Sequence, residues 1–117
     1  MIRRGQLYWV DLGEPRGSSP GYERPAVVIQ DNDFNRTSLR TVIVAILTTN
    51  LRLANMDGNT LLLPGANGLR EPSVVNVTQV YTVNKSDLTE PIGRLNRSEM
   101  DMVDKGIRLV LALPVKR

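Results

Sequence analysis

Short apolar segments separated by glycine- and proline-rich turns run through most of the chain. They are rich in the β-branched, aliphatic and aromatic residues that favour strands, and each is too short for an ordinary helix. The predicted strands are 6–12, 23–30, 41–49, 60–63, 73–77, 79–83 and 91–95. Six or seven short strands favour a small barrel or a strongly bent sheet over alternating strand–helix units.

The hydrophobic pattern changes period near the C-terminus. Apolar residues now recur three or four positions apart, at Met100, Val103, Ile107, Val110 and Leu111. This spacing predicts one amphipathic helix. Asn96 or Ser98 can cap its start, with Glu99 or Asp101 completing a capping box, and Pro114 ends it. We therefore predict a mainly β with α (α+β) fold, in which the helix covers one end of the barrel.

Three polar segments connect the predicted strands. Residues 13–22 hold three Gly, two Pro and two Ser and predict a long surface loop, and residues 50–59 predict a second polar loop. In the third, Asp31 and Asp33 flank Asn32, and their oxygens could hold Mg²⁺. No other carboxylate cluster supplies a third ligand, so we predict a turn or short helical turn and no metal site.

The amino-acid composition limits the kinds of catalytic and metal site that the chain can contain. The chain has 117 residues, which fits one domain spanning 1–117, and it contains no His and no Cys. This excludes disulfides, thiolate nucleophiles, Cys/His zinc sites and every mechanism that uses imidazole. The net charge is +3, and 12 of the 15 basic residues are Arg, whose planar donors suit phosphates, so the charge mildly favours a nucleic-acid partner. No apolar run approaches the roughly 20 residues of a bilayer span, so we expect a cytoplasmic protein.

Two polar positions could carry chemistry. Arg24 and Glu23 stand where the first loop enters an apolar strand, and alternation puts them on opposite faces. Arg24 could belong to a structural ion pair, or it could be a cation that receives a phosphate. Thr48, Thr49 and Asn50 end the most apolar strand and have the same ambiguity, since Thr is common in strands and Asn in turns.

The order of these segments resembles the MazF/PemK toxin family. The resemblance is carried by the blocks RGQLYWVDL at 4–12, Gly17-Ser18, RPAVVIQ at 24–30, Asn35, VIVAILTTN at 42–50, Ser73-Val74-Val75 with Gln79, KSDL at 85–88 and Ile92-Gly93. It implies a small SH3-like or CcdB-like toxin barrel. It also implies a homodimeric, metal-independent endoribonuclease without cofactors, which cuts single-stranded mRNA at a short sequence and is inhibited by an antitoxin of the MazE type.

The resemblance assigns catalysis to Arg24 and Thr48. The substrate's own 2′-OH attacks the phosphorus and leaves 2′,3′-cyclic phosphate and 5′-OH ends. Because a guanidinium remains protonated at neutral pH, Arg24 suits charge stabilisation better than proton transfer. We expect Thr48 to donate a hydrogen bond to a phosphoryl oxygen and protons to move through water or Glu23.

The predicted substrate-binding residues are taken from the two loops, the strand ends and the start of the strand at 79–83: Arg16, Gly17, Ser18, Ser19, Glu23, Thr49, Asn50, Arg52, Gln79 and Tyr81. Two of them depart from the family pattern. Ser19 replaces a carboxylate, and Tyr81 replaces an Arg. Tyr81 could pack in the core or could stack on an unpaired base.

Two other functions remain open from the sequence. A CcdB-like toxin would poison gyrase by binding it, through a C-terminal segment that carries Trp. This chain has its single Trp at position 9, which argues against that function. A catalytically silent barrel that binds RNA or a partner is the second, and the presence of both Arg24 and Thr48 argues against it.

Overall fold

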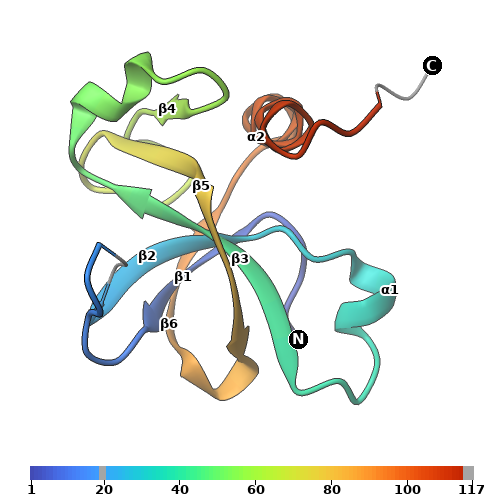
Figure 1. Cartoon of the computed structure of the whole chain (residues 1–117). Helices are drawn as coiled ribbons and strands as arrows, with labels where there is room; N and C mark the ends of the chain where they lie inside the picture. Colours follow the sequence, from blue (N-terminus) through green and yellow to red (C-terminus); the bar gives the residue numbers. More distant parts are fainter. Residues whose placement is uncertain (19–20, 115–117) are drawn as a thin grey trace.

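The computed structural model describes residues 1–18 and 21–114, which form a curled antiparallel sheet and a C-terminal helix (Figure 1). The sheet has six strands in the order β4-β5-β3-β2-β1-β6. Its strands are β1 (Gln6–Asp11), β2 (Glu23–Val28), β3 (Thr41–Thr48), β4 (Thr60–Leu62), β5 (Ser73–Asn84) and β6 (Leu88–Arg94). The helices are α1 (Asn32–Asn35), η1 (Leu51–Asn55), η2 (Lys85–Asp87) and α2 (Arg97–Val110). The expected bent sheet with a terminal helix is confirmed.

Apolar side chains are buried on both faces of the sheet. One core cluster includes Leu7, Val27, Ala45 and Leu47 and packs beneath α2 through Val103. The other occupies the opposite face and consists of Val10, Ala26, Val28, Val42, Val44 and Ile46. Neighbouring residues of a strand point to opposite faces, so the uninterrupted apolar run of β3 supplies both clusters. Burial of each Val, Leu or Ile side chain in these clusters favours folding by about 1.5–3 kcal/mol.

The predicted strands at 73–77 and 79–83 are a single strand, β5, which contains a bulge. Its partners on β3 jump from Val80, opposite Ala45, to Asn76, opposite Ile46. Three residues of β5, numbers 77–79, therefore have no direct partner on β3. In the sequence, the polar Thr78 separates the two predicted strands. A bulge gives the same pattern because its extra residues leave the ladder while the strand continues.

The start of β6 and the content of the second loop also differ from the prediction. β6 begins at Leu88, three residues before the predicted start, and it contains Pro91. A proline is tolerated there because β6 is an edge strand that pairs only with β1. In addition, the predicted loop at 50–59 contains the 3-10 helix η1, whose N-cap is Asn50.

α2 starts with the expected capping box. The Asn96 side chain accepts a hydrogen bond from the Glu99 amide at 2.8 Å, and Glu99 Oε1 accepts one from the Asn96 amide at 2.9 Å. α2 also packs closely on the turn before β4, where Gly106 meets the backbone of Gly58. In the described part of the chain, no helix is long and apolar enough to span a bilayer.

The Gly106 contact predicts that Gly106→Ala lowers stability. A Cβ at this position would overlap the Gly58 carbonyl oxygen and crowd Val77. Alanine favours the helix by about 1 kcal/mol, but overpacking that forces backbone to shift typically costs about 1–3 kcal/mol, and the overlap with the Gly58 carbonyl is severe. We expect a thermal midpoint several degrees below that of the wild type.

Gly65→Ala is the matched control, because a Cβ there has no atom within 4 Å. It should change the free energy of unfolding by less than about 0.5 kcal/mol. A Gly106→Ala protein that melts at or above the wild-type temperature would contradict the packing described here.

Candidate functional site

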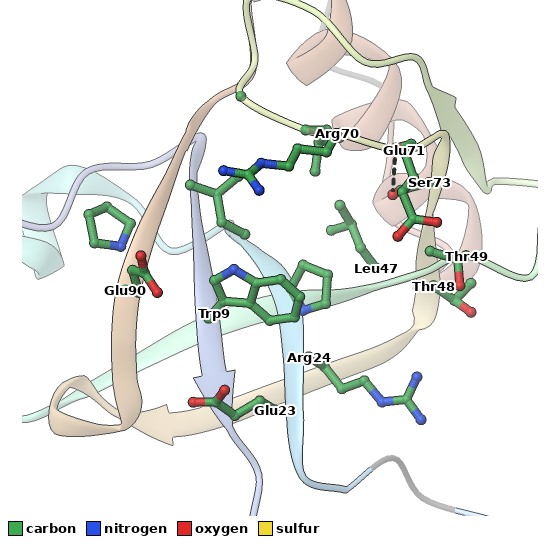
Figure 2. A pocket seen from close by; sticks show the side chains of 15 residues that line it. Trp9, Glu23, Arg24, Leu47, Thr48, Thr49, Arg70, Glu71, Ser73 and Glu90 are labelled. Atoms are coloured by element: carbon green, nitrogen blue, oxygen red, sulfur yellow. Dashed lines mark hydrogen bonds between the residues drawn. The ribbon is translucent and has the colours of Figure 1, made fainter.

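Two hollows meet at the ends of β2 and β3. The larger has a volume of about 590 Å³ and the smaller about 210 Å³. Three residues line both of them, namely Arg24, Leu47 and Thr48. Figure 2 shows the larger hollow, with Arg24 and Thr48 at one side of it. The two side chains that the resemblance marks as catalytic therefore lie where the hollows join.

The strand register explains why Arg24 and Thr48 come together. β2 and β3 are antiparallel, and their ladder pairs Val28 with Val44 and ends with Ala26 opposite Ile46. Continuing the same register by two residues places Arg24 opposite Thr48, and directly opposed residues of an antiparallel pair project to the same face. Both side chains thus lie just past the last paired residues, where the cleft opens.

The turn after β3 orients the Thr48 hydroxyl. Thr48 Oγ1 accepts a hydrogen bond from the Asn50 amide at 3.1 Å. The Asn50 side chain in turn accepts from the Arg52 amide at 3.3 Å and caps η1. A hydroxyl can donate its proton while its oxygen accepts, so Thr48 can still donate a hydrogen bond to a ligand. Asn50 and Arg52, both predicted site residues, therefore support Thr48 through backbone contacts.

Arg24 does not form the structural ion pair that the sequence left open. Its Nε donates to the Gly21 carbonyl at 3.4 Å, and no carboxylate of the described residues lies within 4.0 Å of its guanidinium. Glu23 instead faces Thr89 of β6, whose hydroxyl lies 3.2 Å from Glu23 Oε1 and 3.2 Å from the Trp9 carbonyl oxygen. The exposed Arg24 side chain keeps donors for an anionic ligand.

The β5 bulge supplies the far wall of the smaller hollow. Gln79 lies in the bulge and Asn76 just before it, and both line this hollow. Asn59 holds the bulge in place, since its Oδ1 accepts from the Val77 amide at 3.0 Å and its Nδ2 donates to the Leu53 carbonyl at 2.9 Å. One half-buried amide thus connects the bulge to η1, whose Leu53 also lines the hollow.

The remaining predicted site residues separate into groups. Ser18 lines the smaller hollow, whereas Glu23 and Thr49 line the larger one. Arg16 and Gly17 lie in the first loop, outside the lining of both hollows, and Ser19 falls outside the described residues. Tyr81 is half-buried, packs against the core cluster that contains Val44, and lines neither hollow.

Several lining residues were missed by the sequence interpretation. In the larger hollow these are Trp9, Arg70, Glu71 and Glu90, and in the smaller one Leu53 and Asn76. Trp9 and Asn76 lie in predicted strands and Leu53 in the predicted loop at 50–59, and no local pattern marks any of the six as a site residue. Their proximity to Arg24 depends on strand order and register.

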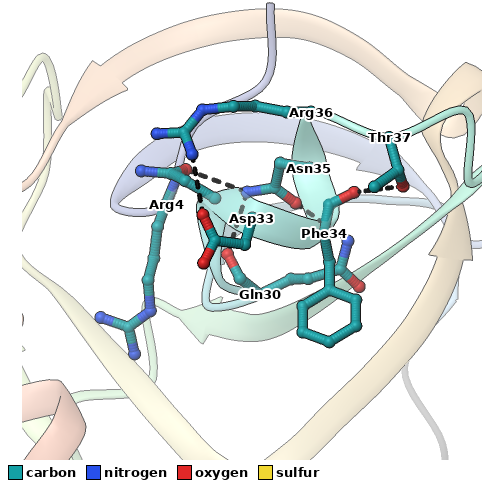
Figure 3. Close-up of polar contacts among 8 residues, drawn as sticks. Arg4, Gln30, Asp33, Phe34, Asn35, Arg36 and Thr37 are labelled. Atoms are coloured by element: carbon teal, nitrogen blue, oxygen red, sulfur yellow. Dashed lines mark hydrogen bonds and ion pairs between the residues drawn. The ribbon is translucent and has the colours of Figure 1, made fainter.

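Asp31 and Asp33 belong to a structural turn, as predicted. They introduce α1, where Asp33 pairs with Arg36 at 2.9 Å (Figure 3). The side chains of Gln30 and Asn35 also bond each other at 2.9 Å beneath this turn. Among residues 1–18 and 21–114, no three acidic side chains gather into a group that could hold a metal ion.

The chain is similar to known proteins over nearly its whole length. Residues 3–111 match the family described as PemK-like, MazF-like toxin of type II toxin–antitoxin system. Over 113 residues, covering 97% of this chain and 99% of the relative, the sequence is 47% identical to endoribonuclease MazF6 of Mycobacterium tuberculosis. It is 34% identical to endoribonuclease EndoA of Bacillus subtilis, over 97% of each chain.

Solved structures confirm the fold. An endoribonuclease from a mycobacterial species, in complex with its cognate antitoxin, superposes with a TM-score of 0.81 at 23% identity, covering 99% of this chain and 100% of that one. MazF of Deinococcus radiodurans superposes with a TM-score of 0.78 at 18% identity, covering 95% of this chain and 96% of that one.

The bridging role of Asn59 can be measured by denaturation. Asn59→Ala leaves the amide of the buried Val77 without its acceptor, and an unsatisfied buried donor costs about 1–3 kcal/mol. We expect the free energy of unfolding to fall by that amount. Asn55→Ala, at an exposed position of η1, should change it by less than about 0.5 kcal/mol, and equal effects of the two substitutions would argue against the bridge.

Proposed function

The chain belongs to the PemK-like, MazF-like toxin family and is an endoribonuclease toxin of a toxin–antitoxin system, and we propose that it cuts single-stranded mRNA at a short sequence without a metal ion. The observation that supports this mechanism is the juxtaposition of Arg24 and Thr48 where two hollows join. The gyrase-poisoning alternative is set aside because the curated relatives are named endoribonucleases.

RNA itself supplies the nucleophile in the proposed reaction. The 2′-oxygen attacks the adjacent phosphorus and loses its proton, the P–O5′ bond breaks, and the leaving 5′-oxygen gains a proton. The products are a 2′,3′-cyclic phosphate and a 5′-OH. The protein must hold the phosphate in line and stabilise the charge on the phosphorane oxygens, which requires neither a protein nucleophile nor a metal.

Arg24 and Thr48 divide this task. The Arg24 guanidinium presents several donors to the phosphoryl oxygens and supplies positive charge, and within residues 1–18 and 21–114 it forms no ion pair. Thr48 donates its hydroxyl proton to a phosphoryl oxygen while the Asn50 amide holds its oxygen. Protons move through water or through Glu23, which lines the larger hollow beside Arg24.

The hollows favour a single strand over a duplex. A base can enter either hollow only when it is unstacked and unpaired, which is how sequence-specific RNA recognition usually proceeds. The smaller hollow presents the amide groups of Asn76 and Gln79 beside Ser18 of the first loop. These groups can read base edges, so we propose that they, with Arg16, Gly17 and Arg52 nearby in the chain, contribute to cleavage specificity.

The remaining features follow from family membership. We propose that residues 1–117 form one endoribonuclease domain that works as a homodimer in the cytoplasm, where its mRNA substrate is. A MazE-type antitoxin segment would order on the toxin and cover the RNA groove. A solved relative in complex with its cognate antitoxin supports this part of the proposal.

Cleavage of a long single-stranded RNA in the presence of EDTA tests the reaction. We expect cuts at one short sequence, with 2′,3′-cyclic phosphate and 5′-OH ends, at a rate that EDTA does not change. RNA in which a 2′-deoxynucleotide precedes the cut should resist cleavage there. Cleavage that stops in EDTA, or that leaves 5′-phosphate ends, would exclude this mechanism.

Arg24→Lys tests the role of the guanidinium, because it keeps the charge but loses the planar set of donors. We expect kcat to fall by about 100- to 1,000-fold, the usual effect of removing one transition-state donor. Arg40→Lys is the control, since Arg40 is exposed and lines neither hollow. Near-normal cleavage by Arg24→Lys would show that charge alone suffices.

A further inference from the structure

Most of the larger hollow lies beyond the catalytic pair, and the proposed reaction does not use it. Its volume of about 590 Å³ is in the range of sites that enclose small molecules, about 300–1,000 Å³. Its apolar lining includes Trp9, Pro25, Leu47, Leu69 and Ile92. A site of this size and composition next to a reactive phosphate can take one nucleobase.

The strand pairing places Trp9 in the same row of the sheet as Leu47, the residue before Thr48 at the end of β3. Trp9 is paired with Pro25 on one side and with Glu90 on the other. Extending the β2–β3 register sets Leu47 opposite Pro25. Glu90, Trp9, Pro25 and Leu47 thus form one row across four strands, and Leu47 is the residue before Thr48. The indole is 38% exposed, so it offers a surface on which a base can stack.

The wall of the larger hollow that contains Gly68 and Ile92 is preformed. Gly68 packs so closely on the backbone of Ile92 and Gly93 that a Cβ at position 68 or 93 would overlap the facing chain. The buried Asn67 fixes the same loop, because its Oδ1 accepts from the Leu69 amide at 3.0 Å and its Nδ2 donates to Glu99 Oε2 at 2.9 Å. A preformed wall reduces the ordering cost of binding.

The charges around this hollow suit a base better than a chain of phosphates. Three carboxylates, Glu23, Glu71 and Glu90, line it together with Arg24 and Arg70 (Figure 2). Carboxylates repel phosphate groups, whereas they accept hydrogen bonds from the amino groups of bases, as Glu and Asp do with cytosine N4. The two arginines can hold the phosphates on either side of the inserted base.

We propose that this hollow is a nucleobase subsite, in which the base of a nucleotide flanking the scissile phosphate stacks on Trp9. The subsite prefers a base with an exocyclic amino group, such as cytosine, over uracil. A nucleobase is favoured over a side chain of a protein partner because Arg24 and Thr48 line the same hollow. The inference rests on the proposed function, since it requires the scissile phosphate to lie at this pair.

The fluorescence of Trp9 reports the subsite directly, since it is the only Trp of the chain. The probe is an RNA oligonucleotide that carries the mapped cleavage sequence, with a 2′-deoxynucleotide preceding the cut so that it cannot be cleaved. We expect binding to quench the indole emission. Removing the base of one flanking nucleotide should abolish the quenching, and removing the base of the other flanking nucleotide should leave it in place.

Cleavage rates provide a double-mutant cycle between protein and RNA. Trp9→Ala should lower kcat/KM by about 10- to 100-fold, which corresponds to the loss of stacking on one base. In the Trp9→Ala protein, the abasic substitution that abolishes quenching in the wild type should cause no further loss. Trp9→Phe should retain most of the rate, and uridine at this position should lower it in the wild type. Phe34→Ala, at a 59% exposed aromatic residue of α1, is the control that should leave the rate unchanged.

The outcomes separate the two proposals. Additive losses from Trp9→Ala and the abasic RNA, or binding without quenching by a chain that cleaves RNA, would overturn the subsite and leave the proposed function intact. That result would favour a protein partner as the occupant. Failure of the proposed function is recognised separately, by a chain that leaves the long single-stranded RNA uncut in the EDTA assay. A thermal melt of each variant distinguishes loss of binding from loss of folding.

Discussion

The antiparallel register between β2 and β3 is the constraint on which the site depends. β3 contributes buried side chains to both core clusters. A slip of its register by one residue would turn every β3 side chain to the other face, where it would no longer fit the cluster it packs in. The core therefore determines which residues face each other where the ladder ends at Ala26 and Ile46. Arg24 and Thr48 meet as a consequence of packing, with no direct bond needed to hold them together.

The same register explains how much the sequence could predict. The apolar run of β3, the first two strands, the capping box of α2 and the turn at Asp31 all follow from local pattern, and their predicted positions agree with the structure to within a few residues. Arg24 and Thr48 could be proposed as a catalytic pair only through the family resemblance. From pattern alone, an Arg at a strand start could equally have been a structural ion pair.

Features that depend on three-dimensional contacts were not predictable in this way. The β5 bulge appears in the sequence only as a polar interruption, so one strand was predicted as two. Trp9 lies beside Pro25 because β1 and β2 pair, and near the loop at 67–71 because Gly68 and Gly93 permit close contact. Tyr81 was ambiguous, since an aromatic strand residue fits a core or a cleft, and only the position of its strand distinguishes them.

A chain without His or Cys needs a source of catalysis other than a tuned acid–base pair. Here the substrate brings its nucleophile, so the protein can act mainly through preorganised donors and charge, which are worth most where they need not reorganise during the reaction. Preorganisation is visible in the fixed Thr48 hydroxyl and in the bulge held by Asn59. In the proposed mechanism, two hollows beside one phosphate also connect the cleavage rate to the RNA sequence. Bases that bind in the hollows would hold the phosphate in line, so a wrong base would lower the rate of the chemical step as well as the affinity.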